Sequence, residues 1–161
     1  MFSSELLLLA KETVSRLSSH GFTIATAESC TGGLIAALLT EISGSSRVFR
    51  YGWITYANAA KIRELSVPAD LIDLHTVVSE PVVKAMAASA QKKSKADFAL
   101  AVSGNAGPSA PKNEPPVGTV CIALATPGGI SSYELFLPDL SRRDFRLAVV
   151  RRSLQLLLDE I

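Results

Sequence analysis

One serine occupies a position where the chain itself could activate it as a nucleophile. Ser29 lies in Ala27-Glu28-Ser29-Cys30-Thr31-Gly32-Gly33, between a β-prone run at residues 23–27 and a helix-like apolar run at residues 31–42. The first N–H groups of a helix are unpaired and carry partial positive charge, so they can hold an oxyanion. We therefore expect the segment from Cys30 to Gly33 (Cys30, Thr31, Gly32 and Gly33) to contact substrate. The alternative is that Ser29 or Thr31 only caps the helix.

A serine nucleophile needs a base, and the histidines of this chain are poorly placed for that role. His20 falls at the end of the first predicted helix, and His75 falls in a predicted exposed loop. Lysine is the remaining base, and it works only when burial or neighbouring cations lower its pKa. Lys61 follows Tyr56 by five residues across a predicted strand end and helix start. We expect Tyr56 to relay a proton or to hold Lys61 beside Ser29.

Three arginines begin the last predicted helix, where the helix dipole disfavours cations. They are Arg142, Arg143 and Arg146, and the first and last share a helix face because they are four residues apart. A phosphate held by Arg142 or Arg146 would explain them. The alternative is a solvated helix face with Asp139 and Asp144 as local partners.

Alternating strand-like and helix-like segments must bring these residues together. The pattern predicts a three-layer α/β/α sandwich with a mixed, mostly parallel sheet of about five strands, one pair of which is a hairpin around Pro127-Gly128-Gly129. We expect helices at 4–19, 31–42, 79–94 and from 141, a short helix from Asn58, and strands at 23–27, 48–56, 98–103, 117–126 and 131–137. Ser103 and the loop that follows it (Gly104, Asn105 and Gly107) are expected to line the pocket.

Composition limits the class of protein. The chain has 161 residues, which fits a single domain spanning residues 1–161, and 48% of them are hydrophobic. Charged residues make up only 19% and the net charge is +1, which argues against nucleic-acid or membrane partners and suggests a homo-oligomer. Two cysteines and the lack of a signal or membrane segment indicate a cytoplasmic protein. We see no metal-ligand spacing and expect neither metal nor cofactor.

Several motifs in a fixed order resemble one known family. They are Ala27–Gly33, Gly44-Ser45-Ser46, Thr55-Tyr56-Ala57-Asn58-Ala59-Ala60-Lys61, Val78-Ser79-Glu80, Met86-Ala87, Ser103-Gly104-Asn105-Ala106-Gly107-Pro108 and Pro116-Val117-Gly118-Thr119-Val120. Together they resemble the CinA C-terminal domain family over nearly the whole chain, in its stand-alone form. The family usually has isoleucine at position 105 and glycines after Pro108, whereas this chain has Asn105 and the segment 109–114.

The resemblance implies an activity and a set of roles. It implies hydrolysis of the carboxamide of nicotinamide mononucleotide to nicotinic acid mononucleotide and ammonia, in pyridine nucleotide salvage. It assigns catalytic roles to Ser29, Tyr56 and Lys61, and it makes Ser46 a substrate contact. Three alternatives stay open: Cys30 as the nucleophile, an amidase with another substrate, and a paralogue that binds a nucleotide-like ligand without hydrolysing it.

Overall fold

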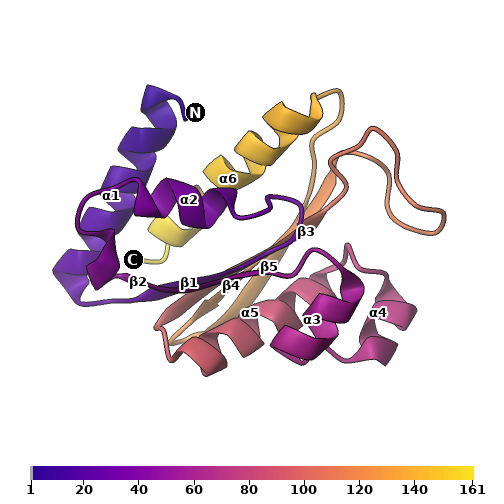
Figure 1. The fold of residues 1–161 in the computed structure, drawn as a ribbon, viewed down its shortest axis with the longest axis horizontal. Helices are drawn as coiled ribbons and strands as arrows, with labels where there is room; N and C mark the ends of the chain where they lie inside the picture. Colours follow the sequence, from indigo (N-terminus) through magenta and orange to yellow (C-terminus); the bar gives the residue numbers. More distant parts are fainter. Residues whose placement is uncertain (1) are drawn as a thin grey trace.

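The computed structural model describes residues 2–161 as alternating helices and strands around one sheet (Figure 1). Along the chain the elements are α1 (Ser4–His20), β1 (Ile24–Glu28), α2 (Leu34–Thr40), a 3₁₀ turn η1 (Ser45–Arg47), β2 (Phe49–Ile54), α3 (Asn58–Leu65), α4 (Ala69–His75), α5 (Glu80–Ser94), β3 (Phe98–Gly104), β4 (Thr119–Thr126), β5 (Gly129–Phe136) and α6 (Arg142–Leu158).

The sheet has the strand order β2-β1-β3-β4-β5. β1 pairs in parallel with β2 and β3, and β4 pairs antiparallel with β3 and β5. Four strands therefore point one way and only β4 points the other way, which confirms the predicted mixed sheet and its hairpin. The parallel strands end side by side, so the residues that follow β1, β2 and β3 meet at one edge of the sheet.

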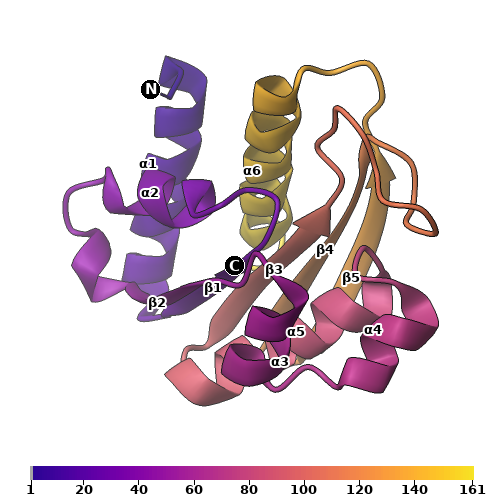
Figure 2. The same cartoon turned by 45° about the vertical axis from the view of Figure 1, so that its right-hand side comes forward.

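Helices cover both faces of the sheet and form the outer two layers. α1, α2 and α6 pack together on one face, and α3, α4 and α5 cover the other (Figures 1 and 2). Strand residues on the α5 side are mostly small, which lets α5 lie close to the sheet: Ala25, Ala27, Ala99, Ala101, Cys121, Ala123 and Ala125. This arrangement is the three-layer α/β/α sandwich expected from the sequence pattern.

Three predicted helix ends are confirmed by their caps. The hydroxyl of Ser3 accepts a hydrogen bond from the N–H of Leu6, and Gly21 ends α1 with a φ of 69°. At α6, the hydroxyl of Ser141 accepts from the N–H of Asp144, as predicted.

Two other expectations were wrong in detail. The second helix begins at Leu34 rather than Thr31, because Gly32 and Gly33 have φ values of 59° and 93° and form a turn before it. His75 is the last residue of the short helix α4 rather than part of a loop, although it is exposed as predicted.

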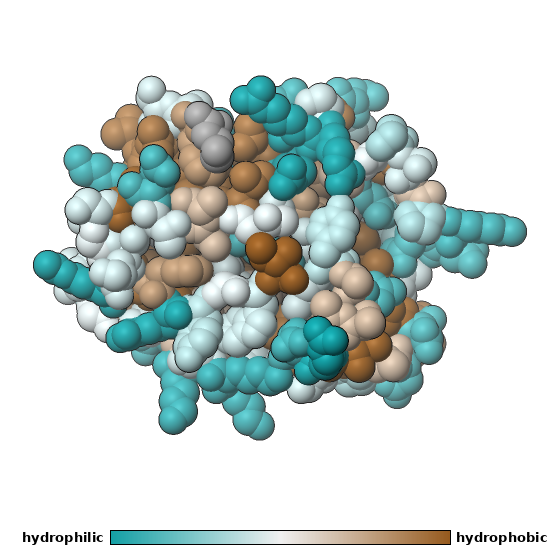
Figure 3. All heavy atoms as spheres, in the orientation of Figure 1, coloured by the Kyte–Doolittle hydropathy of each residue, from teal (hydrophilic) through white to brown (hydrophobic). Residues whose placement is uncertain are grey.

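The free edge of the sheet on the β2 side exposes several large apolar or aromatic side chains. Tyr51, Ile54 and, just beyond the strand, Tyr56 each expose more than half of their surface. Figure 3 shows strongly hydrophobic atoms at the centre of this face of the molecule. Within residues 2–161, no helix is long and apolar enough to cross a bilayer.

Candidate active site

Ser29 directly follows β1 and opens the turn that leads to α2. Its N–H donates to the carbonyl of Val102 in β3 at 3.1 Å, which fixes the serine at the carboxyl edge of the sheet. Its side chain is nearly buried, with 8% of the residue exposed. The serine is thus rigidly held and reachable only from one side.

Lys61 lies on α3 and its amine points at Ser29. The two side chains meet because the end of β2 is tied to the end of β1, where the N–H of Thr55 donates to the carbonyl of Glu28 at 2.9 Å. The Lys61 Nζ is 3.0 Å from the Ser29 Oγ, 2.7 Å from the Thr55 carbonyl oxygen and 3.4 Å from the Tyr56 carbonyl oxygen. The lysine is fully buried, with 0% exposed.

The environment of Lys61 makes its amine easier to deprotonate than that of an exposed lysine. Burial lowers the pKa of Lys61 from 10.5 to about 8, and the smaller opposing electrostatic effects of Cys30 and Glu114 do not cancel this. None of the salt bridges found among residues 2–161 includes Lys61. A buried lysine that contacts a serine hydroxyl, with carbonyls as its other partners, is suited to act as a base.

Cys30, in contrast, is held in its protonated form. Burial, and secondarily the negative charge of Glu28, raises the pKa of the Cys30 thiol from 9.0 to about 12. A thiol is a good nucleophile only as the thiolate. The environment therefore argues for Ser29 rather than Cys30 as the nucleophile.

A buried carboxylate shapes the Ser29 turn. Glu28 accepts hydrogen bonds from the Thr31 hydroxyl at 2.6 Å and from the N–H groups of Gly33, Ile35 and Ala36 at 2.9–3.1 Å. The N–H of Gly32 donates to the Ser29 carbonyl at 2.9 Å. Among the described residues this leaves the N–H groups of Cys30 and Thr31 without a protein acceptor. Thr31 is fully buried, so the N–H of Cys30 is the candidate oxyanion donor.

A pocket of about 270 Å³ opens onto Ser29 and Lys61. It is lined by residues that the sequence singled out and by several that it did not: Ser29, Cys30, Tyr56, Asn58, Lys61, Val77, Val78, Ser103, Gly104, Asn105, Ala106, Gly107, Ser109, Pro111 and Arg142. The predicted wall from Ser103 to Gly107 is therefore part of the pocket.

Tyr56 and Arg142 meet at the mouth of this pocket. The Nη2 of Arg142 donates to the Tyr56 hydroxyl at 2.8 Å, and its Nη1 donates to the Gly107 carbonyl at 2.6 Å. Tyr56 contacts Lys61 through its backbone carbonyl only, so its hydroxyl does not reach the amine. The predicted proton relay through Tyr56 has no hydrogen-bonded path in this arrangement.

Other predicted residues lie outside the pocket. Ser46 is in η1, before the amino end of β2, so one strand length separates it from the edge that carries Ser29. Arg146 faces the backbone of the Ser29 turn instead, and Thr31, Gly32 and Gly33 form that turn without lining the pocket. His20 bonds to the Arg16 carbonyl at the end of α1.

Sequence reasoning missed the structural roles of two glutamates. Glu28 was treated only as a neighbour of Ser29, although an acidic residue before a helix is a known capping signal. Glu114 accepts from the N–H groups of Val77 and Val78 at 3.1 and 3.3 Å and so ties the long loop to the pocket wall. No local pattern connects residues 37 positions apart, so this contact had no signal in the sequence.

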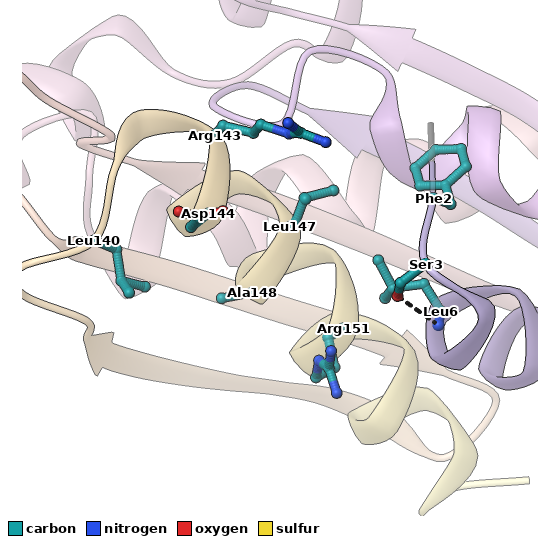
Figure 4. Close-up of a pocket in the computed structure, with 9 residues that line it drawn as sticks. All are labelled: Phe2, Ser3, Leu6, Leu140, Arg143, Asp144, Leu147, Ala148 and Arg151. Atoms are coloured by element: carbon teal, nitrogen blue, oxygen red, sulfur yellow. Dashed lines mark hydrogen bonds between the residues drawn. The ribbon is translucent and has the colours of Figure 1, made fainter.

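Larger hollows lie elsewhere on the surface. One of about 560 Å³ lies between the start of α1 and α6, where Figure 4 shows Phe2, Leu6 and Leu147 among its lining residues. Another of about 570 Å³ lies between α1 and the segment after α2. Neither includes Ser29 or Lys61, so size alone does not mark the site. No cluster of three potential metal ligands occurs among residues 2–161.

Comparisons with known proteins agree with the fold and with the motifs. The chain is 45% identical over 141 residues to the nicotinamide-nucleotide amidohydrolase PncC of Escherichia coli K12, covering 86% of each chain. It is 49% identical over 151 residues to a CinA-like protein of Akkermansia muciniphila, of which it spans only 36%. The crystal structure of the competence/damage inducible protein CihA from Agrobacterium tumefaciens superposes with a TM-score of 0.95 at 39% identity, covering 99% of this chain and 97% of that one.

The match to a family model is almost complete in length. A model described as the CinA C-terminal domain matches residues 7–161, which include every residue of the pocket. The chain belongs to the CinA C-terminal domain family.

Proposed function

We propose that this protein hydrolyses the carboxamide of nicotinamide mononucleotide, releasing ammonia and nicotinic acid mononucleotide for pyridine nucleotide salvage. The observation that carries the proposal is the buried Lys61 amine 3.0 Å from the Ser29 hydroxyl. The name of the Escherichia coli relative, which matches over 86% of its own length, supports the substrate.

Lys61 acts as the general base in this proposal. A neutral amine has two N–H groups and one lone pair, and the carbonyls of Thr55 and Tyr56 accept from the two N–H groups. The lone pair then faces the Ser29 hydroxyl, which becomes the donor. With a pKa of about 8, about 9% of the enzyme carries the neutral amine at pH 7, compared with about 0.03% for an unperturbed lysine.

The reaction proceeds through an acyl-enzyme. The Ser29 oxygen bonds to the carboxamide carbon while its proton moves to Lys61, and the N–H group of Cys30 holds the oxyanion. The C–N bond then breaks, and Lys61 returns the proton to the leaving nitrogen, which departs as ammonia. Water next attacks the ester carbon and gives a proton to Lys61. Ser29 recovers this proton as the acid product leaves.

Tyr56 and Arg142 bind the nucleotide rather than move the proton. The Tyr56 side chain is 57% exposed and lies at the pocket mouth, where its ring and hydroxyl can contact a substrate. Arg142 lines the same mouth and has no carboxylate partner among the described residues, so it is the arginine we assign to the phosphate. Neither Asp139 nor Asp144 forms a salt bridge with it.

Ammonia release from nicotinamide mononucleotide tests the proposal. Wild type should release ammonia, and Ser29→Ala and Lys61→Ala should each lose activity by at least about a thousandfold, because nucleophile and base act as a unit. Cys30→Ala is the matched control, since it changes the adjacent pocket residue and should keep activity within a few fold. Full activity in Ser29→Ala, or its loss only in Cys30→Ala, would contradict the serine mechanism.

The homo-oligomer and the cytoplasmic location stay predictions. The exposed apolar edge formed by β2 is the surface on which a second copy would find unpaired backbone groups and aromatic side chains. Light scattering on the purified protein measures the oligomeric state directly.

A further inference from the structure

Arg146 makes two hydrogen bonds to the backbone of the nucleophile turn. Its Nε donates to the Cys30 carbonyl at 3.1 Å, and its Nη2 donates to the Thr31 carbonyl at 2.8 Å. A planar guanidinium fits two successive acceptors and fixes their orientation. From this geometry we propose that Arg146 is a positioning residue that polarises the N–H group of Cys30, the candidate oxyanion donor. The inference rests on the proposed amidase function.

The peptide groups of the turn connect the Arg146 guanidinium on one side with the N–H groups on the other side. The Cys30 carbonyl shares a peptide group with the Thr31 N–H, one of the two free donors of the turn. A charged donor on the oxygen of a peptide group draws electron density away from its nitrogen, which makes its N–H a stronger donor. Arg146 therefore acts directly on the Thr31 N–H.

The second free donor lies at the end of a longer chain of hydrogen bonds. The Thr31 carbonyl, bound by Arg146, shares a peptide group with the Gly32 N–H, and that N–H donates to the Ser29 carbonyl at 2.9 Å. The Ser29 carbonyl shares its peptide group with the Cys30 N–H. The Cys30 N–H, which is the candidate oxyanion donor, thus ends a hydrogen-bond chain that begins at the Arg146 guanidinium.

Two further features indicate that this contact is specific. A cation in the second turn of α6 is disfavoured by the helix dipole, and the two carbonyls supply the compensating negative ends of dipoles. Gly32 leaves the space that the guanidinium needs, because a Cβ there would lie 3.2 Å from the Arg146 Nη2. Arg146 has no salt-bridge partner among residues 2–161, so no carboxylate neutralises its charge.

Arg146 is not placed to bind the phosphate. It does not line the pocket that holds Ser29, Lys61 and Arg142. It lines a separate hollow of about 270 Å³ together with Phe2, Leu34, Arg143 and Leu147. Of the two arginines predicted to hold phosphate, only Arg142 faces the substrate side.

Steady-state kinetics with nicotinamide mononucleotide separate the two roles. In Arg146→Gln, kcat should fall by about 10- to 100-fold, less than the loss of a whole oxyanion donor, with KM changed by less than about twofold. Arg146→Lys keeps the charge without the fork and should fall between. Arg143→Gln is the matched control, because Arg143 is exposed on the same helix, lines only the hollow of Figure 4 and its neighbour, and should keep both constants.

Chemical rescue distinguishes positioning from a general loss of structure. Millimolar methylguanidinium should restore part of the kcat of Arg146→Ala, whose thermal unfolding is measured alongside. A rise in KM with unchanged kcat in Arg146→Gln would make Arg146 a substrate ligand and overturn the inference. Unchanged kcat and KM in a folded variant would overturn it as well.

A second readout does not need the nicotinamide substrate. Ser29 attacks the sulfur of a sulfonyl fluoride and displaces fluoride, through a transition state that places negative charge on the sulfonyl oxygens, so this labelling also uses the oxyanion donor. Labelling of Ser29 should be about 10-fold or more slower in Arg146→Gln than in wild type, and equal rates would refute the inference. If wild type labels but releases no ammonia from nicotinamide mononucleotide, the proposed function fails while the Arg146 inference is still decided.

Discussion

The pH dependence of kcat/KM gives the sharpest numerical expectation, because it reports the ionisation of the free enzyme. The Lys61 amine must be neutral to accept the Ser29 proton, and burial lowers its pKa to about 8. The neutral fraction is about 9% at pH 7, 50% at pH 8 and 91% at pH 9. We therefore expect kcat/KM to rise about tenfold from pH 7 to pH 9, with its midpoint near pH 8.

The assay is ammonia release at substrate concentrations well below KM across this range. The substrate phosphate does not confuse the result, because its second ionisation lies near pH 6. Lys61→Arg is the control, since arginine keeps the positive charge but cannot lose its proton, and it should be inactive at every pH. A flat profile between pH 7 and 9, or a midpoint near 6.5 as for histidine, would refute Lys61 as the base.

Three more outcomes follow from the same geometry. The pKa of Lys61 is lower in the folded than in the unfolded state, so between about pH 8 and 10.5 the unfolded state binds more protons and stability rises with pH. From pH 7 to 9, the free energy of unfolding of wild type should rise by about 1.3 kcal/mol relative to that of Lys61→Met, as measured by urea unfolding. Parallel plots of the free energy of unfolding against pH for the two proteins would contradict a buried Lys61 charge. Gly33→Ala should destabilise by about 1–3 kcal/mol in thermal unfolding, because Gly33 has a φ of 93° and a Cβ there would lie 2.9 Å from Ile54 Cδ1; an unchanged melting temperature would show that the turn adapts freely. Ser46→Ala should leave KM within about twofold, because Ser46 lies at the opposite end of β2, and a large rise in KM would mean that a second copy brings its Ser46 to the pocket.

Local signals in the sequence predicted most of the fold. Ser3, Gly21 and Ser141 ended or began helices where their side chains and backbone preferences require it. The run from Phe98 to Ser103 was predicted to be a buried strand because it is continuously apolar. Such a run is typical of a strand whose two faces are both covered by helices. The short helix α4 was missed, since seven residues give too little periodicity to identify a helix.

The chemistry of the site was less accessible to sequence. The approach of Lys61 to Ser29 was expected from its position after a strand end and from the family resemblance, but its full burial depends on how α3 packs over the sheet. Arg142 and Arg146 looked equivalent because they share a helix face. Only the fold shows that one reaches the pocket while the other reaches the carbonyls behind the nucleophile. The loop after β3 lacks the glycines usual in the family and is instead held by hydrogen bonds from two side chains. Asn105 donates to the Pro115 carbonyl, and Glu114 accepts from the N–H groups of residues 77 and 78.

The most direct test of the central claim is to find the acyl group on Ser29. Wild type mixed with nicotinamide mononucleotide, quenched in acid within milliseconds and digested, should yield the peptide containing Ser29 with the added mass of the acyl mononucleotide. Fragmentation should place that mass on Ser29, and Ser29→Ala should show no such adduct. The adduct on Cys30, or ammonia release without any covalent intermediate in a rapidly sampled first turnover, would contradict the Ser29–Lys61 mechanism.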